Sequence, residues 1–328
     1  MRTFEYVAPK TTQQAVGLLG AKAQLLAGGT DLLGLMKDDV VRPTRVVNVK
    51  EIGGLDRMGA MGPDTFVIGA AARLSEIANN ADLRQRYPML ANVVDEAASP
   101  QIRNMATIGG NLCQRPRCWY FRSGFGLLAM KNGKSMVAEG DNRNHAIIGN
   151  EGPAKFVSPS TIAPALIAIG SHVTLAGPKG SRTVSLAKFY RIPKTEEERE
   201  HDLLPNEMII ELVLTGQSGP PTHSAQYEVR QKAAFDWPLS LASVALWMDG
   251  KTVKKANVVL GAVAPIPWVS QEAASALVGK ELNAQTADAA TRAAVSIAKP
   301  LSMNGYKVQL TRVAVKRALM QAAEGGQG

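Results

Sequence analysis

The chain has 328 residues, 45% of them hydrophobic, which is too long for one typical core and predicts two or three subdomains. Its 37 basic and 28 acidic residues give a net charge of +9, yet no basic run is longer than Lys254-Lys255. Nucleic-acid-binding proteins cluster basic residues into a patch interleaved with aromatic residues. The missing cluster therefore argues against a nucleic-acid partner and favours a role of the charge in subunit contacts or solubility.

Targeting segments and metal-binding patterns are also missing from the sequence. Residues 1–6 lack the apolar core of a signal peptide, and no apolar run reaches the roughly 18 residues of a membrane span. We expect a soluble cytoplasmic protein, or a periplasmic one if a partner carries the export signal. Cys113 and Cys118 are too few for a four-cysteine cluster, and the four histidines share no ligand spacing.

The first half of the chain alternates strand and helix patterns. Strands are predicted at residues 3–7, 24–27, 45–49 and 65–71. Thr11 and Gln14 have the spacing of a capping box, which predicts a helix running to Leu19. Further helices are predicted at 32–37, 74–80 and 83–98, with a break at Pro88.

Residues 114–150 show little periodicity and are interpreted as an ordered excursion, called the insert below. Trp119, Tyr120 and Phe121 lie there among arginines, a pattern typical of a docking segment or of a local aromatic minicore. A helix follows at 158–169, then a strand at 172–176, a charged helix at 195–201 and a strand at 208–214.

The Gly/Pro-rich run at residues 216–221 marks a domain boundary. Beyond it, strands are predicted at 224–229, 240–248 and 256–261, and helices at 271–277, 286–299 and 305–323. Three strands followed by helices predict a C-terminal α+β domain built on a three-stranded antiparallel sheet.

Two glycine-bearing segments, residues 27–32 (Ala-Gly-Gly-Thr-Asp-Leu) and 106–112 (Ala-Thr-Ile-Gly-Gly-Asn-Leu), stand out as candidate binding turns. In each, an apolar stretch runs into Gly-Gly, which is typical of a strand that ends in a turn. Glycine allows positive φ and lets backbone N–H groups approach an anion. Either segment alone is most simply a tight turn, but the pair suggests a pyrophosphate held from two sides.

The two glycine segments do not match the better-known phosphate-binding loops. Residues 29–34 have the outer glycines of a Walker-type loop, but Leu35 and Met36 follow where Lys and Ser/Thr are required, and the dinucleotide fingerprint Gly-x-Gly-x-x-Gly is absent. No Ser/His/Asp arrangement or His-Glu-x-x-His motif is visible. An enzyme without its own acid–base group would rely on a cofactor for its chemistry, which is consistent with a redox carrier.

The paired segments resemble those of the FAD-binding medium subunit of the molybdenum hydroxylases, the xanthine dehydrogenase and carbon monoxide dehydrogenase family, and the resemblance covers essentially the whole chain. The other matching segments are residues 158–166, 205–210, 236–238 and 259–265. The resemblance implies an α+β fold: an FAD-binding PCMH-type domain of the vanillyl-alcohol oxidase type over residues 1–217, with subdomains at about 1–55 and 56–217, and a C-terminal domain over 222–328.

More narrowly, the insert resembles that of the bacterial aldehyde oxidoreductase branch, where several cysteines can hold a [4Fe-4S] cluster. Cys118 remains here, but Ala129 and Met136 stand about where further cysteines are expected, so we predict no [4Fe-4S] cluster. Two positions also depart from the family near the flavin: Thr161 replaces an acidic residue and Glu228 replaces a lysine. The resemblance still implies bound FAD, with its redox potential or affinity tuned by these two changes.

The resemblance implies a subunit that binds FAD and passes electrons from [2Fe-2S] clusters to an external acceptor. Molybdopterin would lie on a large partner subunit and two [2Fe-2S] clusters on a small one; this chain would have no catalytic or metal-binding residue and no membrane span. The alternatives are a self-contained FAD oxidoreductase and a basic scaffold or nucleic-acid-binding protein. The residues that the resemblance implies at the cofactor are Leu25, Leu26, Ala27, Gly28, Gly29, Thr30, Asp31, Leu32, Thr107, Ile108, Gly109, Gly110, Asn111, Leu112, Thr161 and Ile209.

Overall fold

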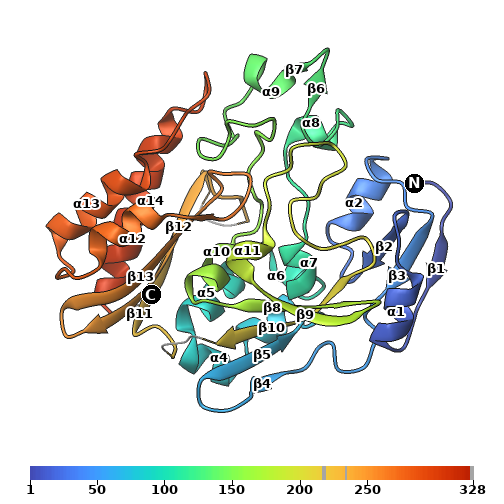
Figure 1. The fold of residues 1–328 in the computed structure, drawn as a ribbon, viewed down its shortest axis with the longest axis horizontal. Coiled ribbons are helices and arrows are strands. Elements are labelled where there is room, and N and C mark those ends of the chain that lie inside the picture. Colours follow the sequence, from blue (N-terminus) through green and yellow to red (C-terminus); the bar gives the residue numbers. More distant parts are fainter. Residues whose placement is uncertain (216–218, 233–234, 326–328) are drawn as a thin grey trace.

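A computed structural model describes residues 1–215, 219–232 and 235–325 (Figure 1). The first sheet is parallel, with strand order β1-β3-β2. Its strands are β1 (Glu5–Val7), β2 (Ala23–Leu26) and β3 (Arg45–Asn48), connected through α1 (Thr12–Leu18) and α2 (Leu32–Lys37). Thr11 Oγ1 accepts the N–H of Gln14, and Gln14 Oε1 accepts that of Thr11, so the predicted capping box is confirmed.

The second sheet is antiparallel, with strand order β4-β5-β10-β8-β9. Its strands are β4 (Met58–Ala60), β5 (Thr65–Gly69), β8 (His172–Gly177), β9 (Gly180–Ser185) and β10 (Met208–Thr215). Strand β10 pairs with β5 although about 140 residues separate them in sequence, and it brings Met208 and Ile210 into the first sheet's cluster of apolar residues, while Ile209 joins the core of the second sheet. The edge strands β4 and β9 were not predicted, because the three residues of β4 are too few to form a pattern and β9 is mostly polar, with little apolar alternation.

The helices α3 (Leu74–Ala78), α4 (Ala81–Arg86), α5 (Pro88–Glu96) and α10 (Ile162–Ala168) contribute side chains to one core with this sheet. Pro88 begins α5, so the predicted break at this proline is confirmed. Every residue of α10 is buried, as expected for a helix that is apolar on all sides. The α10 side chains join residues of the second sheet and of the C-terminal sheet in one core, so the two sheets share their packing.

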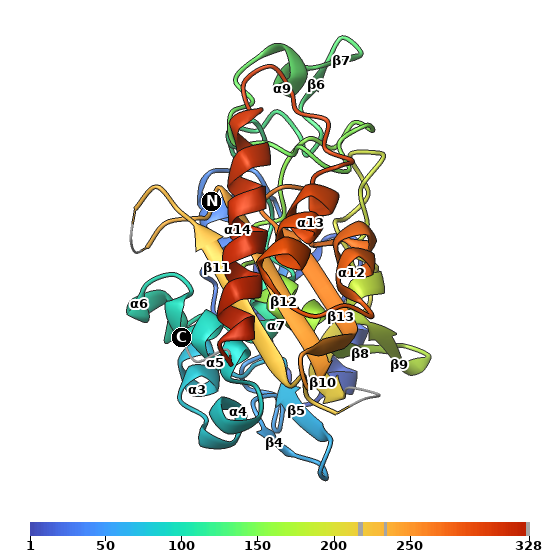
Figure 2. The same cartoon turned by 90° about the vertical axis from the view of Figure 1, so that its left-hand side faces the viewer.

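The C-terminal sheet is antiparallel and has the strand order β11-β12-β13-β14. Its strands are β11 (His223–Val229), β12 (Ser240–Asp249), β13 (Thr252–Gly261) and β14 (Trp268–Val269), and the helices α12 (Gln271–Leu277), α13 (Ala284–Ala294) and α14 (Tyr306–Ala323) cover one face (Figure 2). The α+β prediction is confirmed, with a short fourth strand added to the predicted three. Helix α13 ends earlier than predicted, at Ala294 rather than Lys299.

The insert contains α8 (Trp119–Arg122), β6 (Met130–Lys131), β7 (Lys134–Ser135) and α9 (Met136–Glu139), at the top of Figure 1. The rings of Trp119 and Tyr120 lie against His145, with centroids 6.0 and 5.9 Å away, so a local aromatic cluster does form. The buried amide of Asn304, just before α14, donates to the carbonyl of His145 at 3.1 Å. The insert is thereby joined to the C-terminal domain.

Residues 195–201 do not form the predicted helix. Their acidic side chains bond to the insert instead: Glu196 accepts the N–H groups of Leu127 and Leu128 at 2.6 and 3.0 Å, and Glu200 pairs with Arg115 at 2.9 Å. These long-range contacts override the weak helical pattern. The remaining helices are α6 (Pro100–Arg103), α7 (Ile108–Leu112) and α11 (Leu186–Phe189). Across the described ranges, no helix has both the length and the apolarity needed to cross a membrane.

Candidate functional site

A cavity of about 1090 Å³ lies where the first sheet, α7, the segment 196–209 and the start of the C-terminal domain meet. Pockets for drug-sized ligands occupy roughly 300–1,000 Å³, so this cavity suits a large ligand. Both glycine segments line it, although they lie about eighty residues apart in sequence. The structure therefore brings the two segments to one site.

The first glycine segment depends on two different properties of glycine. A Cβ on Gly28 would lie 1.9 Å from the carbonyl oxygen of Met105, so Gly28 allows the two segments to pack backbone against backbone. Gly29 has φ +74°, a conformation that other residues rarely adopt. The segment therefore turns at Gly29 and contacts the second segment at Gly28.

The turn leaves backbone donors without partners. Leu33 N–H donates to the Gly29 carbonyl at 3.2 Å, which turns that carbonyl toward α2. The Thr30 N–H belongs to the same planar peptide and points the opposite way. In the described part of the chain, the N–H groups of residues 28–31 donate to no acceptor. Consecutive free N–H groups of this kind form a site for an anion.

The second segment differs from the predicted strand and turn: Ile108 to Leu112 form the short helix α7. Thr107 is its N-cap, and the Thr107 hydroxyl accepts the Gly110 N–H at 3.2 Å. A Cβ on Gly109 would lie 2.9 Å from the Ala70 carbonyl oxygen, so this glycine allows α7 to pack tightly on the second sheet. A threonine cap outweighs the strand-like appearance of the preceding residues.

The backbone donors of α7 are already used. Ile108 and Gly109 donate to the carbonyls of Ala72 and Ala70, at 3.0 and 2.9 Å, and Asn111 donates to that of Thr107 at 2.9 Å. The expectation that N–H groups of residues 109–111 hold a phosphate therefore needs revision. What this segment offers is side chains, above all Asn111, whose Oδ1 accepts the Ser160 hydroxyl at 2.6 Å and so turns its amide NH₂ elsewhere.

Replacing Thr107 by alanine tests the importance of the α7 cap. Loss of an N-cap side chain lowers the free energy of unfolding by about 1 kcal/mol, and we expect that decrease in denaturant unfolding. Thr107→Ser keeps the hydroxyl and should restore most of the stability. Equal stability of the alanine variant and the wild type would show that the cap contributes nothing.

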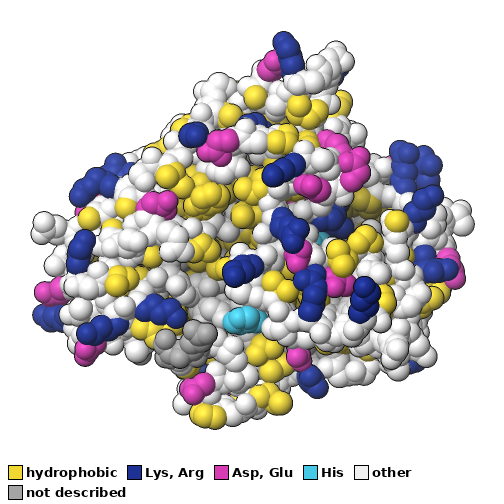
Figure 3. Space-filling model, viewed as in Figure 1, with side chains coloured by type: hydrophobic (Ala, Val, Ile, Leu, Met, Phe, Trp, Pro, Cys, Tyr) yellow, Lys and Arg dark blue, Asp and Glu magenta, His cyan; other side chains and the backbone are white. Residues whose placement is uncertain are grey.

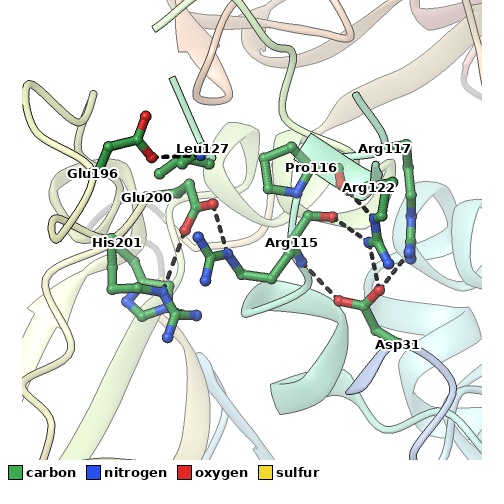
Figure 4. Close-up of polar contacts among 10 residues, drawn as sticks. Asp31, Arg115, Pro116, Arg117, Arg122, Leu127, Glu196, Glu200 and His201 are labelled. Atoms are coloured by element: carbon green, nitrogen blue, oxygen red, sulfur yellow. Dashed lines mark hydrogen bonds and ion pairs between the residues drawn. The ribbon is translucent and has the colours of Figure 1, made fainter. Parts of the chain in front are cut away.

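Asp31 binds three groups of the insert (Figure 4). Its Oδ1 pairs with the guanidinium groups of Arg117 and, at 2.7 Å, Arg122, while its Oδ2 accepts the Arg115 N–H at 2.8 Å. Burial alone would raise the pKa of Asp31, but the charge of Arg117, the Arg115 N–H and Arg122 together lower it below the usual value. Asp31 is thus ionised and fixes the first glycine segment to the insert.

A second set of ion pairs, around Glu200, is joined to the contacts of Asp31 through Arg115. Arg115 Nε donates to Glu200 at 2.9 Å, and Arg199 Nε lies 3.4 Å from the other oxygen of Glu200. Burial and the neighbouring charges of Arg199 and Arg115 lower the pKa of His201 to about 3, so this imidazole stays neutral. The arginines of the cavity wall are therefore largely neutralised by carboxylates, which makes the free N–H groups of the first segment, together with the Asn111 amide, the donors best placed for an anion.

Charges of both signs are interspersed over the face seen in Figure 3. The net charge of +9 is thus not gathered there into a single basic patch. This agrees with the absence of basic runs in the sequence.

The sequence-predicted residues divide into two groups. Most of them line the cavity, whereas Ile108 and Leu112 are buried in the core and Leu26 is outside the cavity wall. Glu228 is outside the wall as well; it pairs with Arg230 at 2.6 Å. The predicted residues that line the cavity are Leu25, Ala27, Gly28, Gly29, Thr30, Asp31, Leu32, Thr107, Gly109, Gly110, Asn111, Thr161 and Ile209.

The cavity wall also contains charged and aromatic residues that were not predicted from the sequence as site residues, among them Arg115, Arg117, Arg199 and Trp237. The arginines at the start of the insert are evident in the sequence, but their contacts with Asp31 could not be predicted from it. Cys118 lies in the same region, with its Sγ 3.2 Å from His145 Nε2, and burial raises the pKa of its thiol. The described residues include no group of three or more His, Cys, Asp or Glu side chains placed to hold a metal ion.

Comparison with known proteins identifies the family. The family model of the FAD-binding domain in molybdopterin dehydrogenase matches residues 2–214, and that of the CO dehydrogenase flavoprotein C-terminal domain matches residues 225–322. The chain belongs to the FAD-binding medium subunits of the molybdenum hydroxylases. Its cofactor is accordingly FAD, and it is an oxidoreductase subunit.

Full-length relatives agree with this family assignment. The aldehyde oxidoreductase FAD-binding subunit PaoB of Escherichia coli K12 is 30% identical over 98% of this chain and 99% of its own length. The carbon monoxide dehydrogenase medium chain of Hydrogenophaga pseudoflava is 29% identical, over 97% of this chain and 96% of its own. A solved structure of carbon monoxide dehydrogenase from that organism matches with a TM-score of 0.78 and 28% identity, covering 98% of each chain.

Proposed function

We propose that this medium subunit is the electron outlet of a heterotrimeric molybdenum hydroxylase that oxidises an aldehyde, xanthine or an N-heteroaromatic compound. The substrate reacts on a large molybdopterin subunit, and electrons pass through two [2Fe-2S] clusters of a small subunit to the FAD of this chain. From there they leave to an external acceptor. Support comes from the family of the chain and from relatives named as subunits or chains of such enzymes.

The observation that carries this proposal is the set of free N–H groups at residues 28–31, facing a cavity of about 1090 Å³. The pyrophosphate bridge of FAD carries two negative charges, and neutral backbone donors bind it without requiring a free arginine. Thr30, Thr107 and the Asn111 amide add side-chain hydrogen bonds, and Ile209 packs against a ring of FAD. Bound FAD supplies a redox centre; the residues of this chain hold and orient it.

We further propose the division into an FAD-binding domain over residues 1–217 and a C-terminal domain over 222–328. Each main sheet falls within one of the segments 1–55, 56–217 and 222–328. A cytoplasmic location of the complex remains part of the proposal.

The experiment is to purify the protein with its bound partners and to measure flavin, molybdenum and iron. We expect one FAD on this chain, with molybdenum and two [2Fe-2S] clusters on two other polypeptides, and flavin reduction by substrate only in the complete complex. If the isolated chain reduced its own flavin with the substrate, a self-contained FAD oxidoreductase would replace the proposal.

A further inference from the structure

Trp237 is an oriented aromatic ring at the wall of the cofactor cavity. It lies between β11 and β12 and lines the cavity, yet 53% of its surface is exposed. The guanidinium carbon of Arg117 lies 5.2 Å from the centre of the ring. An arginine in this position stacks favourably on the face of a tryptophan ring.

Arg117 is itself held in place. Its guanidinium pairs with Asp31 and donates to Gln114 Oε1 at 2.9 Å, and only 29% of its side chain is exposed. The backbone N–H of Trp237 donates to Asp236 Oδ1 at 3.0 Å, which fixes the main chain at this residue. The ring is thus oriented by a chain of contacts that begins at Asp31, in the segment that carries the free N–H groups.

A large aromatic ring that is oriented but half exposed has apolar surface left to bury. Planar rings stack on tryptophan with an offset, and such pairs contribute beyond the area that they bury. FAD has two planar rings, the isoalloxazine and the adenine, joined through the pyrophosphate. Because Arg117 bridges Asp31 and Trp237, the indole lies within reach of a ring whose pyrophosphate rests on residues 28–31.

We propose that Trp237 stacks on one of the two planar rings of bound FAD and that Arg117 positions it; this inference rests on the proposed cofactor site. Trp237 is a binding residue with no role in proton transfer. Stacking on the isoalloxazine changes the environment of the chromophore, whereas stacking on the adenine contributes affinity alone.

The test compares Trp237→Leu and Trp237→Phe with the wild type in the full chain, by titrating the FAD-depleted protein with FAD. We expect Trp237→Leu to bind FAD roughly 3- to 10-fold more weakly, and Trp237→Phe, which keeps an aromatic ring, to bind nearly as well as the wild type. Tryptophan fluorescence should be quenched by FAD less in Trp237→Phe than in the control Trp119→Phe, since Trp119 is exposed outside the cavity.

The visible spectrum of bound FAD identifies the ring. A shifted flavin band in Trp237→Leu assigns the isoalloxazine; weaker binding with an unchanged band assigns the adenine. Equal affinity and equal quenching in all variants would overturn the inference while leaving the FAD site intact. Failure of the wild-type protein to bind FAD would instead contradict the proposed function itself.

Discussion

Replacing Gly28 by alanine is expected to abolish tight FAD binding and to lower the free energy of unfolding by about 3 kcal/mol. The added Cβ would lie 1.9 Å from the Met105 carbonyl oxygen and 2.6 Å from its carbonyl carbon. Backbone atoms cannot move aside as a flexible side chain can, so the two glycine segments must separate. Denaturant unfolding and FAD titration measure both effects.

Gly34→Ala is the matched control, because it places the same methyl group on a nearby glycine. Gly34 lies inside α2, and a Cβ there meets no atom within 4 Å. Alanine in a helix interior is more stable than glycine by roughly 0.5–1 kcal/mol. We therefore expect this variant to be slightly stabilised and to bind FAD normally; a Gly28→Ala protein that behaved in the same way would contradict the packing described for the two segments.

Replacing Asp31 by asparagine is expected to lower the free energy of unfolding by about 2–3 kcal/mol and to weaken FAD binding. The change leaves Arg117 and Arg122, with 29% and 20% of their side chains exposed, without their carboxylate partner. Breaking a fully buried pair costs about 3–5 kcal/mol, and partial exposure reduces that figure. Unfolding in denaturant and FAD titration are the measurements.

Asp39→Asn is the control for the loss of one carboxylate charge. Asp39 pairs with Arg42 at 2.9 Å, but both side chains are exposed, and such surface pairs contribute about 0–1 kcal/mol. If Asp39→Asn destabilised the protein as much as Asp31→Asn, the buried network would have no special importance.

The pH dependence follows from the lowered pKa of Asp31. The ordinary pKa of an aspartate is 3.8. When the pH falls below this pKa, Asp31 of the unfolded chain binds a proton more readily than Asp31 of the folded protein does. The contribution of Asp31 to the free energy of unfolding is therefore fully present above that pKa and is lost as the pH falls below it. The stability difference between wild type and Asp31→Asn should accordingly shrink in acid; a constant difference would contradict the lowered pKa.

Local signals in the sequence predicted local structure well. The capping box at Thr11 and the break at Pro88 each depend on residues within four positions of one another, and both are confirmed. The long strands of the C-terminal sheet were predicted from their apolar content, whereas the two-residue strand β14 is too short to leave a pattern.

Long-range contacts explain what the sequence did not predict. The Gly28 contact with Met105 and the pairs of Asp31 with Arg117 and Arg122 join residues that lie 77 to 91 positions apart, so no local pattern marks them. The same holds for Glu196 and Glu200, whose bonds to the insert replace a predicted helix. The glycine segments could be found from the sequence. Only the structure shows that Gly28 allows a close backbone contact whereas Gly29 adopts a positive φ.

The cavity beside residues 28–31 is proposed to hold FAD. The most direct measurement is the flavin content of the purified wild-type protein, by absorbance and by mass spectrometry of the released cofactor. We predict one FAD per chain, or stoichiometric uptake when FAD is added. A folded protein that neither contained nor took up FAD would contradict the account.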